Sequence, residues 1–163
     1  MTRLFDDVGS LQKQLKSDIM TSIQNKLFEI CEEVVHDSLL KNVYSYASSG
    51  DFPYDRTMDL FHSVTVDNLT IGTKYASFDV YMDSSKINAH ITQPWEWNQH
   101  ASVEEMDVSE YIPLWVEEGT SGSLWDREGA HYMEQAWIKL DDDLAGALAR
   151  AMRALGWEVI DVS

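Results

Sequence analysis

The chain has 163 residues, a formal net charge of −16 and a hydrophobic fraction of 44%. That length suits one domain, and the apolar content can bury a core, which disfavours wholesale disorder. The excess of carboxylates disfavours nucleic acid and anionic membrane surfaces as partners, because both attract Lys and Arg. No apolar run approaches the roughly 18 residues of a membrane-spanning helix. The single cysteine, Cys31, excludes a disulfide framework and is typical of a reducing compartment.

After an N-terminal tail at 1–9, residues 10–47 predict one long helix. Apolar residues recur there at spacings of three and four, which places them on one stripe. The stripe consists of Leu11, Leu15, Ile19, Ile23, Leu27, Ile30 and Val34. Ser10 is the expected N-cap, because its hydroxyl can accept from a free backbone N–H. A Ser/Gly/Asp cluster before Pro53 then predicts a loop.

Residues 61–82 change to an alternating apolar pattern, which predicts a β-hairpin. Its expected strands are FHSVTV and YASFDVYM, with DNLTIGTK as the turn. Residues 83–108 show no clear period, and Pro94 argues against a helix interior. We expect a long excursion or a β-hairpin arm there, since long loops in compact domains are often contact devices.

Residues 109–163 predict a strand, a helix and a final strand. The first strand is YIPLWVEE, and its turn needs Gly119 for a positive φ. Asp126 is the expected cap of a helix that starts near Arg127, and Gly156 is its expected C-terminal glycine. The helix carries the apolar residues Met133, Trp137, Leu140, Leu144, Leu148, Ala151 and Leu155. WEVIDV is the last strand.

This order of elements predicts a single domain over residues 1–163 with an α+β fold. The expected architecture is a small, mostly antiparallel β-sheet with two long helices packed on it, plus the excursion or arm.

Two Glu-x-x-His pairs, Glu33–His36 and Glu128–His131, suit a carboxylate-bridged metal site in principle. Such sites need four helices with two further glutamates, and this sequence supports two helices. His90 and His100, with Glu104 and Glu105 beyond them, have no spacing that forces a zinc site. No nucleophile elbow, Walker loop, dinucleotide fingerprint or Cys-x-x-Cys is present. The sequence therefore predicts a non-enzyme with no catalytic residues, no metal and no cofactor.

Tryptophans in loops and at strand ends are the main candidates for contact residues, because Trp buries a large area at low entropic cost. For Trp95 and Trp97 a core role and an interface role are equally balanced, whereas Trp115 favours the core. The glutamates that end the predicted strand YIPLWVEE, at the rim of the sheet, are further candidates. The predicted interface residues are Trp95, Trp97, Glu117, Glu118 and Trp125.

The stretch YIPLWVEEGT, followed by a helix, resembles a pattern of the tail-completion and head–tail joining proteins of tailed bacteriophages. The matching positions are Tyr111, Val116, Glu117, Gly119 and Thr120. A second family pattern, Arg-Thr-Gly-x-Leu-x-x-Ser, is similar to RTMDLFHS at 56–63, where Met58 replaces the usual glycine. A long N-terminal helix is a third shared feature.

The resemblance implies a structural virion protein: a ring subunit at the head–tail junction, as tail terminator, tail-completion protein or neck connector. It implies a homo-oligomer, expected as a hexameric ring, between connector or portal-side proteins and tail-tube proteins. DNA would pass without specific binding, and assembly would take place in the bacterial host cytoplasm. The resemblance leaves the head side and the tail side equally open.

Two other functions remain open from the residues alone. An acidic monomeric binding protein, such as a DNA mimic, would space carboxylates like phosphates. A metal enzyme would use Glu33, His36, Glu128 and His131. The first should be a monomer or dimer, and the second should purify with stoichiometric metal.

Overall fold

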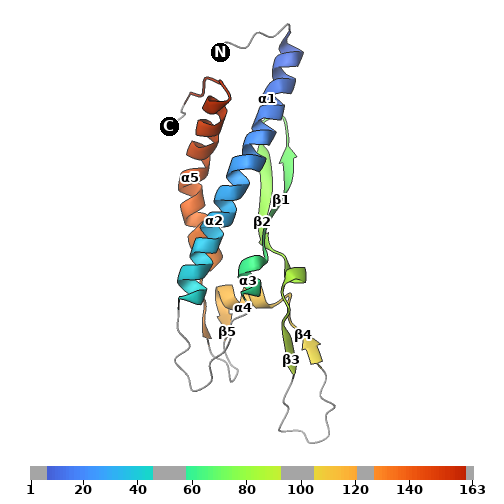
Figure 1. The fold of residues 1–163 in the computed structure, drawn as a ribbon, viewed down its shortest axis with the longest axis vertical. Helices are drawn as coiled ribbons and strands as arrows, with labels where there is room; N and C mark the ends of the chain where they lie inside the picture. The colour runs from blue at the N-terminus through green and yellow to red at the C-terminus, as the bar shows by residue number, and fades with distance from the viewer. Residues whose placement is uncertain (1–6, 46–57, 93–104, 121–126, 161–163) are drawn as a thin grey trace, which may run out of the picture. The chain divides into compact units, whose positions relative to one another are not determined.

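The computed structural model describes residues 7–45, 58–92, 105–120 and 127–160 (Figure 1). The predicted fold class is confirmed: two long helices pack on a two-stranded antiparallel sheet. The chain divides into two compact units. The first unit consists of residues Met1–Val35, Val66–Val80 and Glu134–Ser163; the second consists of His36–Thr65 and Tyr81–Met133. A single domain over residues 1–163 stays a prediction.

The N-terminal helix begins at Val8, two residues earlier than predicted, and Asp7 rather than Ser10 is its N-cap. The Asp7 carboxylate accepts from the Ser10 backbone N–H at 2.7 Å, and the Ser10 hydroxyl faces the Asp7 backbone N–H at 3.4 Å. This reciprocal arrangement is a capping box, which satisfies two amides that the first turn would otherwise leave unpaired. The prediction missed it because both residues are good caps.

The helix continues without a break through α1 (Val8–Ser22), η1 (Ile23–Leu27), α2 (Phe28–Leu39) and η2 (Leu40–Tyr44), and η1 and η2 are π-helical. Six of its buried apolar residues follow one another at every fourth position: Ile23, Leu27, Cys31, Val35, Leu39 and Val43. In an α-helix such a stripe would rotate by about 40° per step. The wider π turns offset this rotation, so the stripe stays on the buried side.

In the first unit, the hairpin of β1 (Val64–Ile71) and β2 (Ala76–Met82) closes where the Gly72 amide donates to the Tyr75 carbonyl. The predicted hairpin is confirmed, but its predicted turn is wrong, because DNLTI continues β1. Val64 and Val66 are buried, whereas beyond Asn68 the half-buried residues are Leu69 and Ile71. Asn68 has a φ of 59° and shifts the inward side by one residue, as a β-bulge does.

The core of the first unit joins the N-terminal helix, the hairpin and α5 (Tyr132–Ala154), which lies beside α1 in Figure 1. Ile23, Leu27 and Ala147 are its buried centre. Partly buried residues packed around them are Ile19, Phe28, Ile30, Leu69, Phe78, Leu144 and Leu148. The rings of Phe28 and Phe78 lie 5.2 Å apart. The predicted stripes on both helices therefore meet in one core.

The end of α5 confirms Gly156 as the C-terminal glycine, with a φ of 89°. Gly156 N donates to Arg153 O and Trp157 N donates to Met152 O, the two bonds of a Schellman motif. The Trp157 indole N–H then donates to the Asp18 carboxylate at 2.8 Å. The predicted final strand is wrong over the described residues 157–160, because the chain turns back onto α1.

Helix α5 also departs from its predicted start and stripe. It begins at Tyr132 rather than near Arg127, because Arg127–Glu128 form the short strand β6; Asp126 lies outside the described residues. Trp137, predicted on the buried stripe, is 66% exposed, and its neighbour Ile138 is 60% exposed. Ala136 and Tyr132 are buried instead, so the first part of the stripe is shifted by one position.

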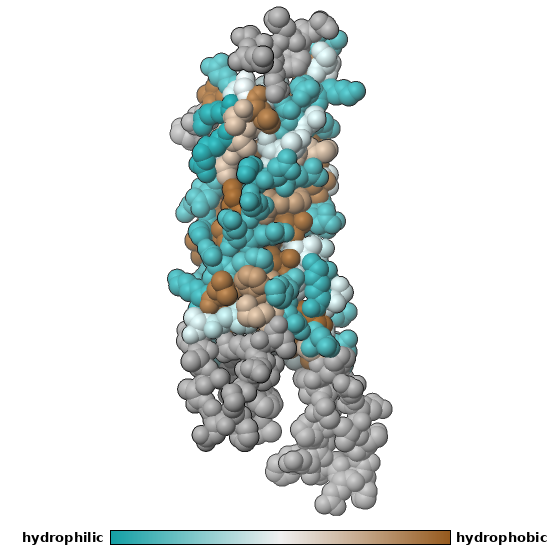
Figure 2. Space-filling model, viewed as in Figure 1, coloured by the Kyte–Doolittle hydropathy of each residue, from teal (hydrophilic) through white to brown (hydrophobic). Residues whose placement is uncertain are grey.

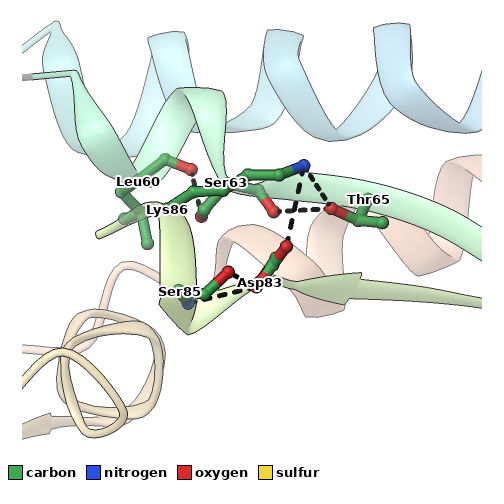
Figure 3. A network of polar contacts seen from close by, with 6 residues as sticks. All are labelled: Leu60, Ser63, Thr65, Asp83, Ser85 and Lys86. Carbon is green, nitrogen blue, oxygen red and sulfur yellow. Dashed lines mark hydrogen bonds and ion pairs between the residues drawn. The ribbon is translucent and has the colours of Figure 1, made fainter.

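In the second unit, the short helix α3 (Asp59–His62) follows Met58, which has a φ of 60°. A polar network holds the chain beyond α3 to the 3-10 turn η3 (Ser84–Lys86) (Figure 3). Lys86 donates to the Thr65 hydroxyl at 2.9 Å and lies 3.9 Å from the Asp83 carboxylate. Hydrogen bonds from Ser85, followed by the Lys86 charge, hold the pKa of Asp83 below its ordinary value.

The excursion after η3 begins as a β-hairpin arm. Strand β3 (His90–Thr92) pairs antiparallel with β4 (Glu105–Asp107), with His90 opposite Asp107. The Val108 amide extends this pairing by donating to the Ala89 carbonyl. Residues 93–104, and with them Trp95 and Trp97, lie outside the described residues.

The face drawn in Figure 2 is mostly hydrophilic, with hydrophobic residues scattered among the polar ones. This distribution agrees with charge that is spread along the chain. Neither long helix, nor any other helix among the described residues, carries a stretch apolar enough to cross a bilayer.

Candidate interaction surface

The stretch YIPLWVEE forms helix α4 (Ile112–Glu118), so its predicted strand is wrong. Pro113 occupies the first turn, where its missing N–H is harmless and its fixed φ suits a helix. Val116 is buried on the inner side, whereas Tyr111 and Leu114 are 46% and 53% exposed. The apolar pattern of this stretch fits a strand and a helix equally poorly, with apolar residues at 111, 112, 114, 115 and 116. The wrong prediction of a strand follows from this ambiguity.

Gly119 ends α4 with a φ of 88° and a ψ of 179°, a backbone conformation reached almost only by glycine. This confirms the predicted need for glycine at the turn. The chain then forms β5 (Gly119–Thr120), which pairs antiparallel with β6 (Arg127–Glu128). Residues 121–126, and with them Trp125, lie outside the described residues.

The segment after β6 satisfies the end of α4. Ala130 N donates to Val116 O at 2.8 Å, and His131 N donates to Glu117 O at 3.1 Å. Gly129 makes this approach possible, because a Cβ there would lie 2.5 Å from Glu117 O and 2.8 Å from Glu118 O. Carbonyls that a short helix leaves unpaired are thus bonded by a segment more than ten residues downstream.

Glu117, a predicted interface residue, has a structural contact within the chain. Its Oε2 accepts from the Met133 backbone N–H at 2.9 Å, in the first turn of α5. A carboxylate at this position satisfies an unpaired amide and interacts favourably with the helix dipole. Glu118, the neighbouring predicted residue, is exposed.

An open pocket of about 350 Å³ lies beside α4 in the second unit. Its lining comes from the end of β2, the start of η3, the turn before α4, α4 itself and the start of α5. The lining residues are Met82, Ser84, Glu110, Pro113, Leu114, Glu117, Tyr132 and Met133. Apolar side chains therefore line much of the pocket, and two carboxylates accompany them.

Buried Tyr132 fixes one wall of the pocket. Its carbonyl accepts from the Ser38 hydroxyl at 2.7 Å, and its phenol donates to the Pro113 carbonyl at 3.4 Å. Burial, with smaller contributions from Glu117 and Tyr44, raises the pKa of the phenol above its ordinary value. The phenol therefore stays protonated and acts as a fixed donor.

An exposed apolar ridge continues from the pocket along α4. Leu114 lines the pocket and is also half exposed, while Tyr111 stacks on Trp115 with ring centroids 5.6 Å apart. Trp115 is half-buried, so the predicted core position is only partly realised. Residues 111, 114 and 115 share one face because they are three and four positions apart.

The two Glu-x-x-His pairs do not form matching helical sites. Glu33 and His36 lie on α2, where His36 stacks on Phe61 at 3.9 Å and its Nε2 lies 3.0 Å from the Phe61 carbonyl oxygen. Glu128 lies in β6, and His131 precedes α5 with a φ of 48°. Within the described ranges, no three His, Cys, Asp or Glu residues come together as metal ligands.

The two serines and the cysteine that could be considered nucleophiles have packing roles. Ser63 is fully buried at the end of α3, and its hydroxyl donates to the Leu60 carbonyl (Figure 3). Ser38 donates to Tyr132 as described. Burial, and to a lesser extent the Glu32 charge, raises the pKa of the Cys31 thiol to about 11. None of these groups is prepared for attack on a substrate.

The pocket residues Met82, Leu114 and Met133 were not predicted from the sequence as a site. For Leu114 the sequence holds one partial signal, because the neighbouring Pro113 suits the first turn of a helix, but the apolar spacing does not decide between helix and strand. Met82 and Met133 are 51 positions apart in the printed sequence, and no local pattern joins them.

Comparisons of the chain with protein-family models, with curated proteins and with solved structures found no match.

Proposed function

We propose that this protein is a structural, non-enzymatic subunit that assembles side by side and joins other protein assemblies. The setting we propose is the head–tail junction of a tailed bacteriophage, as a tail terminator, tail-completion protein or neck connector. The assembly would be a ring, most simply a hexamer, through which DNA passes.

The observation that carries this proposal is the exposure of large apolar side chains on two separate helices. Tyr111 and Leu114 are exposed on α4, and Trp137 and Ile138 are exposed on α5. A subunit that assembles with its own copies and also joins another assembly needs separate surfaces for the two kinds of contact; we assign the α5 surface to the ring and the α4 surface to the other assembly. An enzyme would need converging reactive groups rather than outward apolar ones.

The backbone at the resemblance motifs supports the same proposal. Met58 stands where the phage pattern has glycine, and it adopts a left-handed conformation that glycine adopts without strain. Gly119 of the other motif also has a positive φ. The antiparallel pairing of β3 with β4 fits the predicted β-hairpin arm, which we propose as a contact element.

The acidic DNA mimic remains the second candidate. Asp141, Asp142 and Asp143 are all exposed on α5. Exposed Trp137 and Ile138 precede them on the same helix, and uncharged bulky groups would interrupt an array that imitates phosphates. We therefore favour the joining role.

The test is native mass spectrometry of the purified full chain at micromolar concentration, followed by negative-stain imaging, alone and with isolated phage tails and capsids. We expect closed rings, alone or on one of these particles. A monomer that binds neither particle would contradict the proposal.

A matched pair of variants tests the α5 surface. Trp137→Ser should abolish ring formation and leave the fold intact, because Trp137 is 66% exposed. Tyr75→Ser removes an aromatic ring that is 64% exposed at the hairpin turn and should leave the rings unchanged. Equal loss in both variants would argue against a specific contact at α5.

A further inference from the structure

The pocket beside α4 combines an apolar interior with an acidic lining. Met82, Pro113, Leu114 and Met133 supply apolar walls, and Glu110 and Glu117 supply carboxylates. No Lys or Arg occurs among the described residues that line it. Its volume of about 350 Å³ lies at the lower end of the range for ligand sites, which suits one large side chain better than a cofactor.

We propose that this pocket docks a segment of a different protein, in which an apolar anchor residue is flanked by Lys or Arg. The anchor side chain enters between Leu114 and Met133. Its basic neighbours meet Glu110, which lines the pocket, and Glu118 at the end of α4. Glu110 and Glu118 are both exposed, so each can reach a cation without losing a buried partner.

The net charge of the chain favours a basic partner over a second copy of the chain in this pocket. A second copy carries the same net charge of −16 and would bring its own carboxylates to this lining. Like charges brought together at an interface are costly, whereas opposite charges speed association and fix the orientation of the partner. A basic segment from another protein therefore fits better than a copy of this chain.

The ridge on α4 indicates a peptide segment rather than a free small molecule. Tyr111 and Leu114 extend the apolar surface beyond the pocket, and Glu117 is held in place by its bond to Met133 N. A short helix or extended segment would cover the ridge while its anchor fills the pocket. The inference rests on the proposed function only in taking this surface as a joint between proteins.

The experiment is fluorescence anisotropy of the full chain with labelled synthetic peptides. The probe has a central Leu-Trp pair flanked by Lys and Arg. One comparison peptide keeps the centre with Gln flanks, and another keeps the basic flanks with a Ser-Ser centre. We expect the probe to bind, each comparison peptide to bind about tenfold more weakly, and added salt to weaken probe binding.

Single substitutions test whether the probe peptide binds at the pocket beside α4. Leu114→Ser should weaken the probe about tenfold, as loss of an anchor contact does. Leu40→Ser is its matched control, because Leu40 is 44% exposed elsewhere in the second unit. Glu110→Gln should weaken binding about threefold and flatten its salt dependence, while Glu33→Gln on α2 should not.

Several results would overturn the inference: no binding of the probe, equal binding of the Gln-flanked peptide, or equal losses in Leu114→Ser and Leu40→Ser. Loss of self-association in Leu114→Ser would make a second copy the occupant and would overturn it too. Peptide binding without rings would sink the proposed function alone, and rings without peptide binding would sink this inference alone.

Discussion

The core of the first unit and the α4 region of the second unit are stabilised by different kinds of contact. In the core, Ile23, Leu27 and Ala147 lie on continuous helices whose backbone bonds are local. The α4 region contains a helix of seven residues. Its last backbone carbonyls accept hydrogen bonds from residues 130 and 131, and the Glu117 side chain accepts one from a backbone amide in the first turn of α5. The core depends on apolar burial, whereas the α4 region depends on a few polar contacts and two glycines.

The largest expected effect is in the core. Leu27→Ala should lower the free energy of unfolding by about 3 kcal/mol, because it removes a buried side chain and leaves a cavity. Leu40→Ala, at a 44% exposed position of the same helix, should cost less than about 1 kcal/mol. Chemical denaturation, followed by circular dichroism and by Trp fluorescence, measures both. Equal costs would show that the stripe at 27 is not the core.

The second largest effect on stability is expected at the turn that ends α4. Gly119→Ala should lower the free energy of unfolding by about 2 kcal/mol, because a side chain is strained at a φ of 88°. Gly146→Ala is the matched substitution inside α5, where the new Cβ would meet only the flexible end of Arg150. It should raise stability by about 0.5–1 kcal/mol. If both changes had the same sign, the backbone argument at Gly119 would fail.

These first two variants also test the single-domain prediction. If both units unfold together, Leu27→Ala and Gly119→Ala will shift one transition that both spectroscopic probes report alike. Separate transitions, each moved by only one variant, would show that the two units unfold independently.

Alkaline pH should weaken the core through Cys31. Below pH 9.0 the thiol is protonated in both states and has no effect; above it the unfolded chain ionises while the folded thiol stays protonated up to about pH 11. Stability should therefore fall as pH rises through this window, by about 1.4 kcal/mol at pH 10. In Cys31→Ala, the free energy of unfolding measured by denaturation should fall less with pH over the same range, by the amount that Cys31 contributes. Identical pH profiles would contradict the assignment.

The smallest effect is expected at the carboxylate that joins α4 to α5. Glu117→Gln keeps an acceptor for Met133 N but removes the charge at the start of α5, which should cost about 0.5 kcal/mol. Glu118→Gln, one residue on and exposed, should change stability by less than this. Thermal denaturation at low salt compares the two, and added salt should reduce the difference.

What the sequence determined by itself was the set of long regular elements. Each of these signals involves residues only a few positions apart in the sequence. They are the apolar stripes at 11–34 and 140–155, the alternation in β1 and β2, and the glycines at 119 and 156. Periodicity and positive φ are local properties, so a single sequence can reveal them. The fold class and the need for glycine at two turns followed from such patterns.

Tertiary structure alone decided the α4 region and the pocket. Whether YIPLWVEE became helix or strand depended on Ala130, His131 and Met133 as partners, which no local pattern specifies. Met82 and Met133 meet Leu114 only after the chain has folded. The shift of β1 at Asn68 is of the same kind, since packing of Leu69 against the helices overrides strict alternation. Where many apolar contacts agree, the sequence suffices; where single hydrogen bonds between distant residues decide, the tertiary structure is needed.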